Sequence, residues 1–189
     1  MKIAFYTLGC KVNQYESQAM SEKAAANGFE IVTTDEEADI YVVNSCTVTA
    51  ESDRKTRQAV RKFKRNHPES IVVLTGCMPQ AFPQDAERLE QADIVLGNKN
   101  NSRLFDLIHS YFSCGQRIID IEKHKTGDKF SGGDISGFDR RTRAVVKIED
   151  GCNRFCILID RICSTNPLSV CNCSWAERRA TPCGGSFWT

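Results

Sequence analysis

No stretch of this sequence approaches the roughly 20 consecutive apolar residues that a membrane-spanning helix needs. The first residues run directly into a strand-like segment and lack the long apolar region and cleavage site of a signal peptide. The sequence therefore predicts a cytoplasmic protein with no membrane partner. A charge excess is also lacking, because 25 basic and 24 acidic residues leave a net charge of +1. Any basic surface must then be local.

Histidine is scarce and cysteine is abundant. The three histidines, His67, His109 and His124, all lie outside the loops that follow the predicted strands. The chain has ten cysteines, of which four precede residue 150 and six follow it. In a reducing compartment such a number favours metal binding or catalysis over disulfides.

Strand and helix patterns alternate over residues 1 to 112. The predicted strands are Lys2–Thr7, Phe29–Val32, Asp39–Val43, Ile71–Leu74 and Ile94–Leu96. The predicted helices run from Asn13 to Gly28, Thr49 to Asn66, Gln80 to Gln91 and Ser102 to Tyr111. This alternation predicts an α/β fold, a doubly wound parallel sheet with helices on both faces.

Residue composition changes after the first domain, 1–112. Residues 113–142 are rich in glycine and charge and are predicted to be a linker, with one strand at Arg117–Ile121. Arg143–Ile148 predicts a new strand, so residues 143–189 are assigned to a second domain. Beyond Cys156 no helical or strand period is evident.

Three cysteines each follow a predicted strand: Cys10, Cys46 and Cys77. In a parallel sheet their thiols would meet at the carboxyl edge, where such sheets bind ligands. Three thiolates can hold a metal or an iron–sulfur cluster and leave one coordination position open. A single buried cysteine is often only a small apolar residue. A structural zinc site would need a fourth ligand, so a [4Fe–4S] cluster suits this set better.

Asn13 and Asn44 lie in the same loops as Cys10 and Cys46. Their amides are candidate cofactor-binding groups that would donate hydrogen bonds to cluster sulfurs and tune the potential. The alternatives are a helix cap for Asn13, with Glu16 completing a capping box, and a turn residue for Asn44.

A second pair of thiols lies at Cys152 and Cys156, directly after the predicted strand Arg143–Ile148. A CxxxC pair alone is a weak signal. A third cysteine at position 159 would complete the CxxxCxxC loop of radical S-adenosylmethionine enzymes, but that position holds Ile159.

The second predicted helix carries seven cations in twelve residues with no acidic residue among them: Arg54, Lys55, Arg57, Arg61, Lys62, Lys64 and Arg65. Such a run is commonly a solvated helix face. It can also contact phosphates without reading bases, which makes Arg54, Lys55, Arg57, Arg61 and Lys62 candidate RNA contacts.

These motifs resemble the methylthiotransferase family, in which an N-terminal cluster domain precedes a radical S-adenosylmethionine domain. Residues 7–17 (TLGCKVNQYES) look like the first-cysteine motif of the branch that acts on N6-threonylcarbamoyladenosine in tRNA. Residues 44–49 (NSCTVT) and 75–77 (TGC) resemble the second and third motifs, and residues 54–58 and 95–98 also fit. The resemblance covers residues 1–156, and it implies that residues 143–189 are the truncated start of the radical S-adenosylmethionine domain, a partial (β/α) barrel, with an atypical tail.

The resemblance implies an enzyme that adds a methylthio group to C2 of N6-threonylcarbamoyladenosine beside the anticodon. It implies two [4Fe–4S] clusters, the first on Cys10, Cys46 and Cys77 and the second on Cys152 and Cys156, together with S-adenosylmethionine. The implied partners are the tRNA anticodon arm and an electron donor, and DNA is not expected.

Two departures from the family pattern are present. Ile159 replaces the third cysteine of the second motif, and residues 157–189 do not resemble the start of the partial (β/α) barrel that should follow. We expect a shifted reading frame or a truncated gene product, and hence an incomplete, inactive fragment. A non-catalytic iron–sulfur or electron-transfer module is the alternative function, and a structural zinc protein is a third.

Overall fold

The computed structural model describes residues 1–47, 49–123 and 135. These residues form one six-stranded sheet in which every paired strand is parallel, in the order β2-β1-β3-β4-β5-β6. The strands are β1 (Lys2–Thr7), β2 (Glu30–Val32), β3 (Ile40–Ser45), β4 (Ile71–Gly76), β5 (Ile94–Leu96) and β6 (Ile118–Asp120). The predicted doubly wound parallel sheet is confirmed. The predicted barrel start, 143–189, lies outside the described residues.

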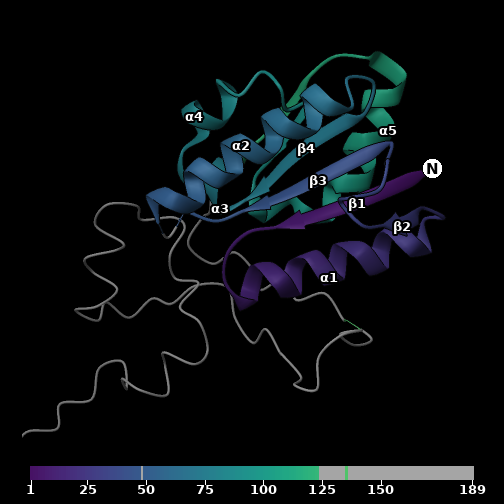
Figure 1. Cartoon of the computed structure of the whole chain (residues 1–189), viewed down its shortest axis with the longest axis horizontal. Coiled ribbons are helices and arrows are strands. Elements are labelled where there is room, and N and C mark those ends of the chain that lie inside the picture. The colour runs from purple at the N-terminus through teal and green to yellow at the C-terminus, as the bar shows by residue number, and fades with distance from the viewer. Residues whose placement is uncertain (48, 124–134, 136–189) are drawn as a thin grey trace, which may run out of the picture.

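Helices cover both faces of the sheet (Figure 1). On one face α1 (Lys11–Ala26) and α5 (Leu104–Cys114) pack against side chains such as Ile3 and Val42. On the other face α2 (Ala50–Asn66) and α4 (Pro83–Glu87) pack against side chains such as Tyr41 and Leu74. β3 and β4 are buried along their whole length, because both faces of a central parallel strand are covered.

The first helix begins earlier than its sequence predicts. Cys10 has extended backbone angles and is the N-cap residue of α1, so Asn13 lies inside the first turn. The predicted capping role of Asn13 is therefore wrong. Its side chain makes tertiary hydrogen bonds instead, and these are described below.

The predicted helix Gln80–Gln91 is two short helices, α3 (Cys77–Ala81) and α4. Pro83 is the first residue of α4, and the residue before it, Phe82, has φ −126° and ψ 67°. A proline disfavours the helical conformation in the residue before it and donates no backbone N–H, so one continuous helix cannot cross this position.

The sheet extends beyond residue 112. The predicted strand Arg117–Ile121 is confirmed as β6, which pairs parallel with β5 through the register Val95↔Ile119. A 3₁₀ helix, η1 (Asn98–Arg103), connects β5 to α5. Within the described ranges, none of the helices has the length and apolar character needed to cross a bilayer.

Candidate metal centre

The three predicted cysteines lie at the carboxyl ends of three adjacent strands. Cys10 follows β1 at the start of α1, Cys46 directly follows β3, and Cys77 follows β4 as the first residue of α3. The register aligns Thr7 with Asn44 and Ser45 with Gly76, so all three loops leave the same edge of the sheet. Cys46 and Cys77 are buried, and Cys10 is half-buried. The three cysteines thus lie where the sequence predicts them, after three strands and at the carboxyl edge of the sheet.

The strand order reverses between β1 and β3. From β1 the chain crosses through α1 to β2 on one side, and from β3 it crosses through α2 to β4 on the other. Loops diverge at such a switch point, and open α/β sheets bind ligands in the crevice between them. Cys10 and Cys46 are on the two loops that flank this crevice.

Gly9 allows the first cysteine loop to approach the second. Its φ of +117° is strained for any residue with a side chain. A Cβ atom built on Gly9 would lie 2.5 Å from Cys46 Cβ and 2.9 Å from Cys46 Sγ. The backbone before Cys10 therefore lies directly against Cys46.

Gly76 has the same role before the third cysteine. Its φ is +96°, and a Cβ atom there would collide with the backbone of Ser45 and lie 2.5 Å from Asn44 Oδ1. The Ser45 hydroxyl joins these loops from the other side, because it donates to Thr75 O (2.6 Å) and accepts from the N–H of Met78 (3.1 Å). The loops of Cys46 and Cys77 are thus held together on both sides.

Asn13 and Asn44 connect the first two loops. Asn13 Nδ2 donates to Asn44 Oδ1 (3.1 Å) and to Ser45 O (2.9 Å), while the Cys10 thiol donates to Asn13 Oδ1 (3.1 Å). Asn44 Nδ2 donates to Asn13 O and to Ser17 Oγ, both at 3.0 Å. Every N–H of both amides is engaged within the protein, so the predicted donation to cluster sulfurs is not what this structure shows.

Ser17 is a member of this network that sequence reasoning missed. Its hydroxyl also accepts from Thr7 Oγ1 at 2.7 Å. No local pattern marks it, because its partners lie 10 and 27 residues away in the sequence. The only available signal is its place on the helical turn after Asn13.

Burial raises the pKa of the Cys10 thiol, and the nearby Cys46 and Glu16 act in the same direction. Hydrogen bonds from the backbone N–H groups of Asn13 and Val12 oppose the shift. The net rise means that the thiol is protonated at neutral pH, so metal binding at Cys10 must release a proton.

Thiolates are the ligands that iron–sulfur clusters take, and three cysteines follow adjacent strands at this edge of the sheet. Among the described residues, no group of three His, Cys, Asp or Glu side chains is gathered closely enough to hold one metal ion. Each cysteine of a cubane cluster binds a different iron, so its ligands stand further apart than those of one zinc ion.

The predicted second cluster site cannot be placed. Cys152, Cys156 and Ile159 lie outside the described residues. The fourth described cysteine, Cys114, is exposed at the end of α5, far along the chain from the three cysteine loops.

The basic run lies on α2, but several of its charges are paired. Arg54 and Lys55 contact Glu51, at 2.6 and 3.6 Å. Arg57 pairs with Asp85 of α4 (3.0 Å), and Lys64 pairs with Asp93 (2.9 Å). Arg61, Lys62 and Arg65 are exposed and form no ion pair with the described part of the chain. These three are the cations that remain for a partner.

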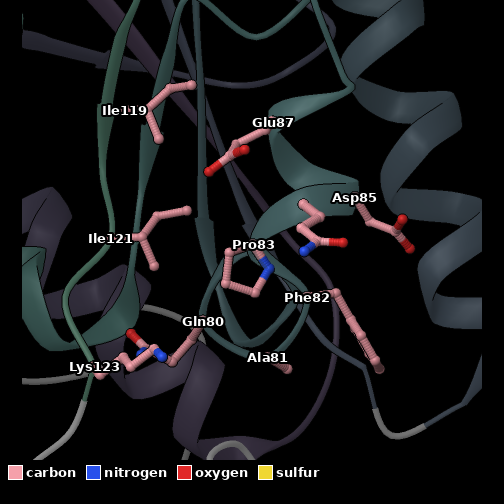
Figure 2. A pocket seen from close by; sticks show the side chains of 10 residues that line it. Gln80, Ala81, Phe82, Pro83, Asp85, Glu87, Ile119, Ile121 and Lys123 are labelled. Atoms are coloured by element: carbon pink, nitrogen blue, oxygen red, sulfur yellow. The ribbon is translucent and has the colours of Figure 1, made fainter.

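A separate pocket of about 710 Å³ lies beside α4 and the end of β6. Figure 2 shows Ile119 and Ile121 on one side of it and Pro83 and Glu87 on the other. None of the described cysteines lines it, so it is distinct from the loops of Cys10, Cys46 and Cys77.

Residues 2–97 match a family profile described as "Uncharacterized protein family UPF0004". The chain is 37% identical to the threonylcarbamoyladenosine tRNA methylthiotransferase MtaB of Aquifex aeolicus, over 82% of this chain and 38% of the relative. It is 36% identical to the protein of the same name in Bacillus subtilis, over 82% and 34%. It is 31% identical to tRNA-2-methylthio-N(6)-dimethylallyladenosine synthase of Finegoldia magna, over 79% and 33%.

The matches therefore cover most of this chain but only a third to two fifths of these relatives. The matched family region, 2–97, contains all three cysteine loops and α2. The predicted resemblance is confirmed: the chain belongs to the UPF0004 family and is a relative of the tRNA methylthiotransferases.

Proposed function

We propose that this chain is the cluster-binding part of a tRNA methylthiotransferase that acts on N6-threonylcarbamoyladenosine beside the anticodon. The observation that carries the proposal is the arrangement of Cys10, Cys46 and Cys77 at the carboxyl ends of three adjacent parallel strands. Identity is 34–37% to four of the threonylcarbamoyladenosine enzymes and 28% to a fifth, against 28–32% to three dimethylallyladenosine enzymes, and this difference supports the proposed substrate.

In this proposal the three thiolates hold a [4Fe–4S] cluster. With only three cysteine ligands, such a cluster would keep one iron free of protein ligands and would supply the position at which the transferred sulfur is bound. The protein's own part is to place the thiols around the crevice, to exclude water by burial of Cys46 and Cys77, and to release the Cys10 proton on loading.

The chemistry at C2 also needs S-adenosylmethionine, a second cluster and an electron donor. We assign the second cluster to Cys152 and Cys156, and we place the protein in the cytoplasm with the tRNA anticodon arm as its partner. The exposed cations Arg61, Lys62 and Arg65 are the part of the predicted RNA surface that is available for phosphate contacts.

Anaerobic reconstitution of the full chain tests the cluster assignment. We expect about four iron and four sulfide per chain and the absorption and EPR spectra of an oxygen-sensitive [4Fe–4S] cluster. Replacing Cys10, Cys46 or Cys77 by alanine removes one of three protein ligands and should abolish loading. The control is Cys114→Ala, which changes an exposed thiol outside the site.

Full iron content in the triple variant Cys10→Ala/Cys46→Ala/Cys77→Ala would contradict the assignment. Zinc without iron in anaerobically purified protein would support a structural zinc site instead. A non-catalytic iron–sulfur module is the second candidate, and Ile159 favours it because the second cysteine loop is one ligand short. Reductive cleavage of S-adenosylmethionine separates these two functions, as argued below.

A further inference from the structure

Asn44 touches all three cysteine loops at once. Its side-chain N–H groups reach Asn13 O and Ser17 Oγ, in the helix that Cys10 begins. Its own backbone precedes Cys46 by two residues, and its Oδ1 lies where a Cβ atom on Gly76, next to Cys77, would be only 2.5 Å away. The side chain is fully buried, so these contacts are shielded from water.

Asn13 connects the Cys10 loop to Asn44, and the orientation of its side-chain amide is fixed. Its amide donates to two acceptors, Asn44 Oδ1 and Ser45 O, and exchanging its oxygen and nitrogen would set an acceptor against both. Its Oδ1 therefore faces Cys10 Sγ in a fixed orientation. Asn44 is fixed in the same way by Asn13 O and by Ser17 Oγ, which itself accepts from Thr7.

We propose that Asn13 and Asn44 form a clamp that sets the relative positions of the three thiol-bearing loops before a cluster is present. They are positioning residues that act through Cys10, Cys46 and Cys77 rather than ligands or hydrogen-bond donors to the cluster. This inference rests on the proposed cluster site. Residues that orient the ligands of a metal typically change its affinity about 10- to 100-fold when they are removed.

Two variants remove the clamp in different ways. Asn13→Ala deletes the donors to Asn44 and Ser45 and the acceptor for Cys10. Asn13→Asp keeps an acceptor of the same shape but loses both donors. The matched control is Asn100→Ala, because Asn100 is also a buried amide near the carboxyl edge but bonds to Asp120 of β6 (3.0 Å).

The first measurement is the rate at which a chelator removes iron from the reconstituted full chain. We expect both Asn13 variants to lose iron about tenfold faster or more and to shift the midpoint potential and the EPR line shape, whereas Asn100→Ala keeps the wild-type values. A residue that only stabilises the fold would move the melting temperature but not the potential. Wild-type iron loss and potential in folded Asn13 variants would overturn the proposal.

The second measurement uses the chain without a cluster, so that it does not depend on loading. Hydrogen exchange of the apo chain should rise in all three loops, residues 8–10, 44–47 and 76–78, in the Asn13 variants and not in Asn100→Ala. If the wild-type chain takes up no cluster, the proposed function fails, and this exchange pattern alone decides the clamp. Faster exchange confined to residues 8–13 would show that Asn13 orders only its own loop, and the clamp would be wrong.

Discussion

Gly9 illustrates how much of the site depends on one residue without a side chain. Its positive φ and its closeness to Cys46 are separate constraints, because the first concerns backbone conformation and the second concerns space. Gly28 has the first constraint without the second: its φ is +81°, and nothing lies within 4 Å of a Cβ atom built on it. Substitutions at Gly9 and Gly28 can therefore distinguish the cost of backbone strain from the cost of a steric collision.

We expect Gly28→Ala to cost about 1–2 kcal/mol of unfolding free energy, which is the usual penalty of a left-handed conformation for alanine. Gly9→Ala should cost more, because its methyl group also collides with Cys46. Denaturant unfolding of the apo chain measures both. Equal losses in the two variants would mean that the Cys10 and Cys46 loops separate freely, contrary to the packing described above.

The surroundings of Asp53 predict how this residue changes the stability of the fold with pH. Burial raises the pKa of its carboxyl, and Asp85 adds to this, while Arg57 opposes it. Its Oδ1 is buried without a hydrogen-bond partner among the described residues. A carboxylate near a helix N-terminus is normally favourable, but here burial outweighs that effect.

Because the pKa of Asp53 is higher in the folded than in the unfolded chain, its contribution to stability is complete below about pH 4 and is lost as the pH rises through the folded value. Asp53→Asn should therefore increase the free energy of unfolding at pH 7 and raise the melting temperature. The increase should be no more than about 1 kcal/mol, because the group is partly solvated. The difference from wild type should vanish towards pH 4. A variant less stable than wild type at pH 7 would contradict this.

Residue patterns predicted the thiols but not what holds them. Cys10, Cys46 and Cys77 were identifiable because strand ends are visible in the local apolar pattern, and parallel pairing then brings strand ends together. The contacts of Asn13 and Asn44 join residues 31 apart in the sequence. The register of β1 against β3 brings Asn13 and Asn44 together, and that register cannot be predicted from a single sequence.

At the scale of elements, prediction succeeded where one signal dominated. α2 follows Thr49 as predicted, and the structure adds that the Thr49 side chain caps it by accepting from the Ser52 N–H (3.1 Å); β5 has the predicted bounds. It failed for the single helix predicted from Gln80 to Gln91, because Pro83 prevents one continuous helix from crossing that position.

Helix α2 separates its charges by face. At 100° per residue, Arg54, Arg61 and Arg65 lie within about 40° of one another, opposite the buried Ala59, Val60 and Phe63. Lys64 and Arg57 are on the side towards β5 and α4, where they pair with Asp93 and Asp85. The stripe of exposed cations that form no ion pair with the described residues, Arg61, Lys62 and Arg65, lies about 10–17 Å beyond Arg54 along the helix, so it extends away from the cysteine edge.

We expect the full chain to bind tRNA weakly and with strong salt dependence through this stripe. Arg61→Glu/Lys62→Glu should lower the affinity and reduce the slope of log K against log salt by a little under about one unit for each lost phosphate contact. Iron content should not change, because both side chains are exposed and lie about three turns along α2 from its first residue, Ala50, which follows the Cys46 loop.

The matched control compares Lys62→Glu with Lys23→Glu, the same charge change on the exposed surface of α1. Only the former should weaken tRNA binding. If affinity and slope stay at wild-type values in the α2 variants, the stripe is a solvated helix face, and RNA recognition belongs to other parts of the protein.

At the scale of the whole molecule, the direction of β6 decides where the chain leaves the sheet. β6 is parallel to the other strands, so residue 123 follows the same edge that carries the three cysteines. Four contacts fix this exit: Gln80 Nε2 to Glu122 O (2.8 Å), Lys99 Nζ to Lys123 O (3.2 Å), Asn100 Nδ2 to Asp120 Oδ1 (3.0 Å) and Arg103 to Asp120 (2.8 Å). Residue 123, the last of the described run 49–123, therefore lies at the edge of the sheet that carries the three cysteines.

A second cluster site would be incomplete in this chain, because Cys152 and Cys156 supply only two thiolates. Ile159 stands where the third would be, and the next cysteine, Cys163, is too far along to complete a CxxxCxxC loop. A cluster that must bind S-adenosylmethionine at its open iron needs three protein ligands. We therefore expect the chain, reconstituted anaerobically and reduced with dithionite, to produce no 5′-deoxyadenosine from S-adenosylmethionine.

The matched variant is Ile159→Cys, which restores the missing ligand and nothing else. Its iron content should rise from about four to about eight per chain if Cys152 and Cys156 are competent ligands. Adding Cys152→Ala to that variant should return the content to about four. Detection of 5′-deoxyadenosine with the wild-type chain would show that two cysteines are enough, and the non-catalytic alternative would then lose its support.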